Sequence, residues 1–121
     1  MKKAIYQNIT IIAFDADDTL WDNESHFRRV EKEFSLLFAK YGTQDEIITK
    51  LSDIEIGNIP QYGYGSKSFM LSLIEAAIEI TNRQLSALEL EQILQMGQSI
   101  LSHSITLLPN VKEVLQKLQG N

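Results

Sequence analysis

The sequence predicts an α/β fold, of which this chain contains only one strand. The rest of the chain is predicted to be mainly α-helical. Three features lead to this prediction: a short apolar, β-branched run, a long region of helical periodicity, and a proline followed by one more helix. The run Ile9–Phe14 has the composition of a strand buried in a parallel sheet. We therefore divide the chain into a first core segment at 1–22, a helical region at 23–104 and a return to the core at 105–121.

The first half of the helical region is expected to hold two helices and a long loop. Asp22 or Asn23 would cap a first helix. A second follows Thr43, which forms a capping-box pattern with Glu46. The stretch from 57 to 65 holds three glycines and a proline, which predicts a loop.

Two more helices and a short final one complete the pattern. Ser66 would cap the third helix, and Ser86 together with Glu89 would cap the fourth. Pro109 then breaks the chain, and the last helix begins at Asn110. Because a single strand cannot satisfy its own backbone hydrogen-bonding groups, we expect the chain to be incomplete or to pair with something else.

The composition is that of a soluble globular protein, with 44% hydrophobic and 22% charged residues. The chain has no cysteine, which excludes disulfides, thiolate chemistry and cysteine-based zinc sites. A formal net charge of -5 argues against nucleic acid or an anionic membrane as the main partner. No stretch approaches the ~20 apolar residues of a membrane span, and the run that begins at Ile9 is too short for a signal peptide. We therefore expect a cytoplasmic protein.

Three acids follow the predicted strand, at Asp15, Asp17 and Asp18. Since Asp15 and Asp17 are two apart, strand alternation directs both to one side of the sheet, at the edge where ligands bind in open α/β folds. Two converging carboxylates repel each other unless a cation lies between them, and their hard oxygens suit Mg²⁺. One carboxylate can form an aspartyl phosphate while a second carboxyl transfers the proton. The simpler interpretation is an acidic turn that caps the next helix.

The segment Phe14–Asp22 resembles the first motif of the haloacid dehalogenase superfamily, an apolar strand followed by D-x-D-x-T-L. The resemblance implies a Rossmann-type core and makes the helical region the family's α-helical cap. It implies that Asp15 is the nucleophile and a magnesium ligand. It also implies that Asp17 is the general acid/base and binds the metal through its backbone carbonyl oxygen. Thr19 would help to fix the turn. Dehalogenases of the superfamily lack an acid at the second position, so Asp17 favours phosphoryl transfer.

The function that the resemblance implies is a magnesium-dependent phosphatase that acts on a small phosphorylated metabolite. The family's later motifs cannot be placed in the sequence, so we expect an N-terminal fragment that is poorly active by itself. One alternative is an inactive helical domain that self-associates as a homo-oligomer. Another is a phosphotransferase or mutase with the same nucleophile.

Two aromatic residues are candidate substrate contacts. Trp21 follows the motif directly, and it would either touch the substrate or pack between cap and core. Tyr64 lies in the glycine-rich stretch, which is either a specificity loop or a plain connection between helices.

Overall fold

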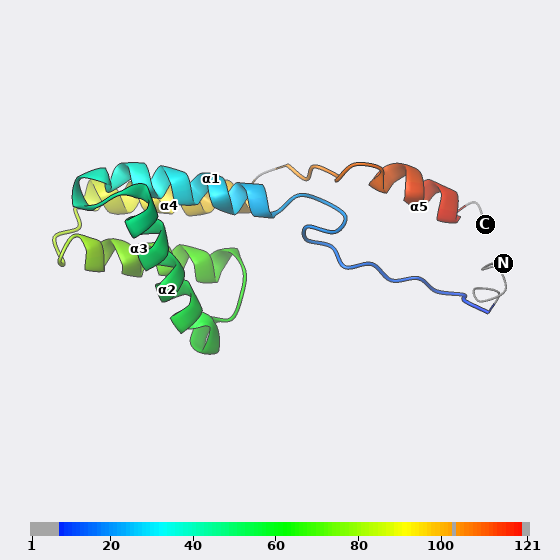
Figure 1. Cartoon of the computed structure of the whole chain (residues 1–121), viewed down its shortest axis with the longest axis horizontal. Coiled ribbons are helices and arrows are strands. Elements are labelled where there is room, and N and C mark those ends of the chain that lie inside the picture. Colours follow the sequence, from blue (N-terminus) through cyan, green and yellow to red (C-terminus); the bar gives the residue numbers. More distant parts are fainter. Residues whose placement is uncertain (1–7, 103, 120–121) are drawn as a thin grey trace. The chain divides into compact units, whose positions relative to one another are not determined.

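A computed structural model describes residues 8–102 and 104–119 of the chain, which are mainly helical (Figure 1). This confirms the predicted fold class of a largely α-helical chain. The contacts divide the chain into two units, each described here by itself. Unit 1 contains residues 1–24 and 105–121, and unit 2 contains residues 25–104. Over the described ranges, no helix is both long and apolar enough to cross a membrane.

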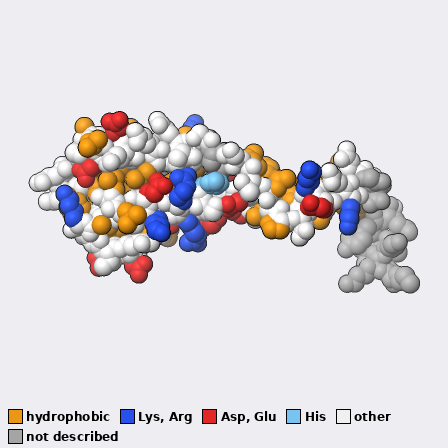
Figure 2. All heavy atoms as spheres, turned by 90° about the horizontal axis from the view of Figure 1, so that it is seen from above, with side chains coloured by type: hydrophobic (Ala, Val, Ile, Leu, Met, Phe, Trp, Pro, Cys, Tyr) orange, Lys and Arg blue, Asp and Glu red, His pale blue; other side chains and the backbone are white. Residues whose placement is uncertain are grey.

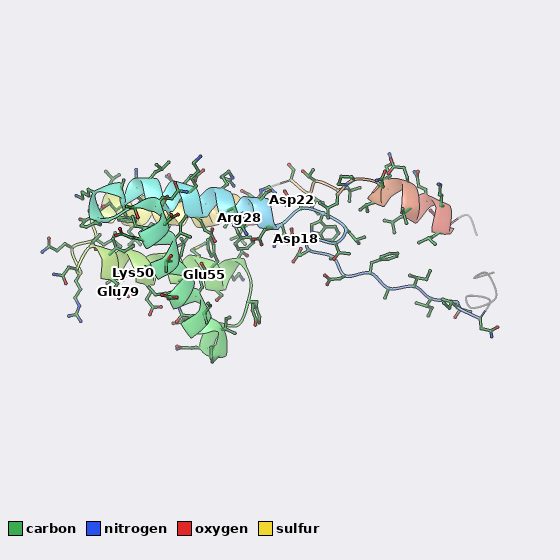
Figure 3. The ribbon with its side chains drawn as sticks, viewed as in Figure 1. Asp18, Asp22, Arg28, Lys50, Glu55 and Glu79 are labelled. Carbon is green, nitrogen blue, oxygen red and sulfur yellow. The ribbon has the colours of Figure 1, made fainter. Side chains whose placement is uncertain are left out.

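Unit 2 is a bundle of four α-helices with one 3-10 turn (Figure 1). The α3 helix packs against both α2 and α4. The α1 helix lies along α4, where the Arg29 guanidinium donates to Ser99 Oγ at 3.3 Å. Lys50 of α2 and Glu79 of α3 form an ion pair at 3.4 Å (Figure 3). The elements are α1 (Glu24–Leu37, whose first residue belongs to unit 1), η2 (Ala39–Tyr41), α2 (Gln44–Tyr62), α3 (Ser66–Ile80) and α4 (Ala87–Leu101).

The core of unit 2 is built from apolar side chains that recur every three or four residues along the helices. Phe34 and Phe38 pack with their ring centroids 5.0 Å apart and are fully buried. Burying a side chain of this kind stabilises a fold by roughly 1.5–3 kcal/mol, so this cluster is the main source of stability in the bundle. Its members are Val30, Phe34, Phe38, Ile47, Leu51, Phe69, Leu73, Ala76, Ala77, Ile93 and Ile100.

Of the caps predicted for α2, α3 and α4, two are confirmed and one is wrong. The Thr43 side chain accepts the Glu46 N–H at the start of α2. Ser86 and Glu89 form the complete capping box of α4, each side chain accepting the other's backbone N–H at 3.0 Å. At α3, however, the residue before the helix is Gly65, and no side chain caps it. Ser66 is the first helical residue rather than the cap.

The long loop predicted from 57 to 65 is also wrong, because α2 continues to Tyr62 with Pro60 inside it. Pro60 has no N–H to donate to the preceding turn, which disfavours a helix here, so contacts with another element have to offset that cost. The Asn58 side chain holds this turn against α3, donating to Ser72 Oγ at 3.1 Å and to the Glu75 carboxylate at 2.7 Å. The connection between α2 and α3 is therefore the short segment 63–65.

The strand predicted at Ile9–Phe14 does not form in unit 1, since the described residues include no neighbouring strand for its backbone to pair with. Instead, the two chain segments that flank unit 2 pair briefly with each other. The Asp22 N–H donates to the Thr106 carbonyl at 2.9 Å, and the Leu108 N–H donates to the Leu20 carbonyl at 3.0 Å. The α5 helix (Val111–Gln119) follows.

Unit 1 leaves much apolar surface exposed, and apolar side chains are visible at the molecular surface in Figure 2. The Ile11 side chain is 84% exposed. The other large hydrophobic side chains exposed in this unit are Ile9, Ile12, Phe14, Ile105, Leu107, Val114 and Leu118.

Candidate active site

The acidic cluster lies on a tight turn in unit 1. The Ala16 carbonyl accepts the backbone N–H groups of Thr19 at 3.1 Å and Leu20 at 2.8 Å. The Asp18 N–H donates to the Trp21 carbonyl at 2.8 Å, which closes the turn. Asp18 has a φ of 60°, in the left-handed region that Asp and Asn tolerate better than most residues. The backbone of the motif is thus fixed by hydrogen bonds within the motif itself.

Each of the two candidate catalytic carboxylates accepts a hydrogen bond from a side chain four residues later. The Thr19 hydroxyl donates to Asp15 Oδ2 at 3.1 Å. The Trp21 indole N–H donates to Asp17 Oδ1 at 3.0 Å. Both carboxylates are exposed. The turn therefore brings together four of the predicted site residues, Asp15, Asp17, Thr19 and Trp21.

The third acid of the cluster connects the turn to the α1 helix. Asp18 Oδ1 accepts the backbone N–H groups of Asn23 at 2.9 Å and of Glu24 at 2.8 Å. A carboxylate at this position also interacts favourably with the positive end of the helix dipole. The simpler interpretation of the sequence, an acidic turn that caps the next helix, did not say which acid would be the cap, and in the structure it is Asp18. The usual capping pattern places the acceptor immediately before the helix, whereas Asp18 lies six residues before Glu24.

The donor set suits a magnesium ion but is only part of a complete site. Asp15 and Asp17 each use one carboxylate oxygen in the hydrogen bonds described above. Their other oxygens are hard donors of the type that Mg²⁺ prefers. Within residues 8–102 and 104–119, no group of three or more His, Cys, Asp or Glu side chains could hold a metal ion.

The remaining predicted site residue, Tyr64, belongs to unit 2. It lies between α2 and α3, and its side chain is 86% exposed. It is flanked by Gly63 and Gly65, whose φ values of 71° and 114° suit glycine.

A model of the haloacid dehalogenase-like hydrolase family matches residues 9–121. The chain belongs to this family. It is also similar to the crystal structure of a haloacid dehalogenase-like family hydrolase from Xanthomonas campestris, with 32% sequence identity and a TM-score of 0.79. That similarity covers 88% of this chain and 45% of the other, so the chain spans less than half the length of this relative. No curated protein matches the chain.

Membership of the haloacid dehalogenase-like hydrolases confirms the resemblance drawn from the motif. The roles of Asp15, Asp17, Thr19, Trp21 and Tyr64 stay predictions, as do the metal and the substrate.

Proposed function

We propose that this chain is the N-terminal part of a magnesium-dependent phosphatase that hydrolyses a small phosphorylated metabolite. The observation that carries the proposal is the motif turn. It exposes two carboxylates, Asp15 and Asp17, and gives each of them one hydrogen-bond donor. Membership of a hydrolase family supports the same assignment.

In the proposed reaction, a carboxylate oxygen of Asp15 forms a bond to phosphorus while the bond from phosphorus to the ester oxygen breaks. Asp17 gives a proton to the departing oxygen. Asp17 then takes a proton from water as the water oxygen attacks phosphorus, which releases inorganic phosphate and restores Asp15.

The two hydrogen-bonded neighbours have positioning roles in this scheme. The Thr19 hydroxyl fixes the rotation of the Asp15 carboxylate, because it holds Oδ2 at 3.1 Å. The Trp21 indole N–H does the same for Asp17 through Oδ1. In this scheme Trp21 orients the side chain of the acid/base, Asp17. This role adds to the substrate contact expected from its sequence position.

Magnesium would be held by the Asp15 carboxylate and the Asp17 carbonyl. When bound, it would offset negative charge on the phosphoryl group. A small substrate is proposed because a helical cap that closes over a site excludes water and bulky molecules.

The test is hydrolysis of p-nitrophenyl phosphate with and without Mg²⁺, by the 121-residue chain and by any longer chain that its gene encodes. In the longer chain, Asp15→Asn should lower the rate at least about 1,000-fold, since it removes the nucleophile. Asp17→Asn should lower it about 100- to 10,000-fold. Asp53→Asn, at an exposed acid of α2, is the matched control and should leave the rate unchanged. Metal-independent hydrolysis, or full activity of Asp15→Asn, would contradict the proposal.

The nature of the phosphate acceptor separates a phosphatase from a phosphotransferase. Release of inorganic phosphate in the presence of a sugar acceptor supports hydrolysis. Transfer of the phosphoryl group to the sugar would instead favour a transferase or mutase.

A second candidate function, self-association without catalysis, is favoured by the exposed apolar side chains of unit 1. Ile11 and Ile105 are 84% and 63% exposed. Large exposed apolar side chains can mark an interaction site when they gather into one patch. Size-exclusion chromatography of the 121-residue chain tests this alternative: a concentration-dependent dimer would support it, and a stable monomer would argue against it.

A further inference from the structure

The segment 9–14 of unit 1 forms neither a helix nor a strand (Figure 1). Among the backbone hydrogen bonds that join described residues, none involves this segment. Its N–H and C=O groups are therefore open to a partner strand. Addition of a strand to an unpaired backbone is a recurring mode of recognition between polypeptide chains.

The side chains of this segment favour such pairing, because large apolar groups stand at both odd and even positions. Ile9 and Ile11 would share one face of a strand, and Ile12 and Phe14 the other. All four are between 44% and 84% exposed. A strand that is apolar on both faces is typical of the interior of a sheet, where it has neighbours. The segment is therefore expected to gain from a second strand beside it.

One of the two faces has apolar cover close by. Phe14 lines a hollow of about 200 Å³ together with Val111, Val114 and Leu115 of α5. In a symmetric antiparallel pair of strands the twofold axis is perpendicular to the sheet, so each residue lies on the same face as its copy. The α5 helices of both copies would then flank one face of the pair, as helices flank the sheet in layered folds.

The charges at the two ends of the segment favour an antiparallel over a parallel pair. Asp15, Asp17 and Asp18 follow it, and the sequence has Lys2 and Lys3 before it. A parallel pair in register would place the acids of one copy beside those of the other, and like charges opposite each other destabilise paired strands. An antiparallel pair separates the two acidic clusters by at least about 20 Å, the length of six residues. It also directs the acids of each copy toward the basic start of the other.

We propose that a second copy of this chain pairs with the segment 9–14, so that the two segments form an antiparallel two-stranded sheet across a twofold axis. The occupant is a second copy because the segment is complementary to itself in charge when it is reversed. The proposal names the interface of the self-association given above as the second candidate function, and it rests on that function. It is independent of the phosphatase reaction.

Sedimentation of the 121-residue chain from about 1 to 100 µM tests the association, and a dimer with a dissociation constant inside this range is expected. Ile11→Lys should weaken the dimer at least about tenfold, since it places a charge at the centre of the pair. The fold should not change, because the Ile11 side chain is 84% exposed. Leu36→Lys is the matched control on α1, where the side chain is 62% exposed, and it should have no effect.

A second pair of variants tests the charges. Lys2→Glu combined with Lys3→Glu should weaken the dimer about tenfold, because the acids of the partner copy would meet acids in place of lysines. Lys32→Glu combined with Lys67→Glu gives the same total charge at exposed positions of unit 2. This control should leave the dimer unchanged.

Cross-linking tests the direction of the pair, and the chain is suited to it because it has no cysteine. Either Ile11→Cys or Ile12→Cys lies at the twofold axis and should form an intermolecular disulfide, since residues directly opposite have Cα atoms about 4.5–5.5 Å apart. Asn8→Cys lies about 20 Å from its copy in an antiparallel pair and should not cross-link. In a parallel pair all three variants would cross-link.

The outcomes separate this proposal from the function on which it rests. Efficient cross-linking of Asn8→Cys, or a dimer that survives Ile11→Lys, overturns the antiparallel pairing but leaves self-association standing. A monomer at about 100 µM overturns both, and so does a monomer that binds a separately produced downstream segment of a longer chain.

Discussion

Replacing Asp18 tests how the motif turn is joined to α1. The Asp18 carboxylate accepts two backbone N–H groups, from Asn23 at 2.9 Å and from Glu24 at 2.8 Å. These donors lie at the first turn of α1, where the helix has no carbonyl of its own to accept them. Asp18→Gly removes the acceptor but tolerates the φ of 60°. Asp18→Ala removes the acceptor and also strains the backbone.

The magnitudes of the two effects can be separated. Loss of a helix cap costs about 1 kcal/mol, within a range of about 0.5–2. A left-handed conformation costs a residue with a Cβ atom roughly 1 kcal/mol more. We therefore expect about 1 kcal/mol for Asp18→Gly and about 2 kcal/mol for Asp18→Ala, which correspond to roughly 5-fold and 30-fold increases in local opening. Asp18→Asn keeps an acceptor oxygen and should change opening by less than either.

Amide hydrogen exchange of the labelled chain measures this opening directly. The Asn23 and Glu24 amides should exchange faster in the order Asn, Gly, Ala at position 18, while the Leu51 amide in α2 serves as an internal reference. If Asp18→Gly and Asp18→Ala left the exchange of both amides unchanged, the hydrogen bonds to Asp18 would not hold the start of α1, and the reasoning would be refuted.

Three further predictions concern unit 2. Phe34→Ala should lower the free energy of unfolding by about 3–5 kcal/mol in urea titrations, since the side chain is fully buried. A Cβ atom at Gly97 would overlap the Met70 side chain, so Gly97→Ala should destabilise the wild-type chain by roughly 1–2 kcal/mol. The same substitution should cost less in a Met70→Ala background, as a double-mutant cycle would show. The Ser86 backbone N–H lowers the pKa of Glu89 below its ordinary value of 4.5. The stability that the ionised Glu89 contributes is therefore present at pH values above 4.5, and it is lost as the pH falls through the lowered pKa of the folded state. When the pH is lowered from about 7 to 3, the melting temperature should fall more for wild type than for Glu89→Gln.

Features that depend on neighbouring residues were predicted well from the sequence. The cap at Thr43 and the capping box at Ser86 each involve residues three positions apart, and both are present. Their signal is complete within one turn of helix, so nothing distant in the chain needs to be known.

Features that depend on distant contacts were not predicted. The stretch from 57 to 65 looks like a loop because Gly57 and Pro60 are poor helix residues. It is in fact helical up to Tyr62. Within this last part of the helix, the Asn58 side chain donates hydrogen bonds to Ser72 and Glu75 of another helix. These bonds join residues 14 and 17 positions apart. The predicted strand fails for the same kind of reason, since a strand forms only where a partner strand is present to pair with it.

The motif turn depends partly on neighbouring residues and partly on distant ones. The positions of its acids are set locally, but the proposed metal binding is not. The hydrogen bonds to the side chains of Asp15, Asp17 and Asp18 come from residues at most six positions further along the chain. The arrangement of the two candidate catalytic carboxylates therefore does not require the sheet. The proposed binding of magnesium is different, because Mg²⁺ gives up its water reluctantly and is usually bound by one or two carboxylates together with substrate phosphates. The position of the acids is thus a local property of this sequence, whereas the proposed magnesium site would also need ligands that lie outside the turn.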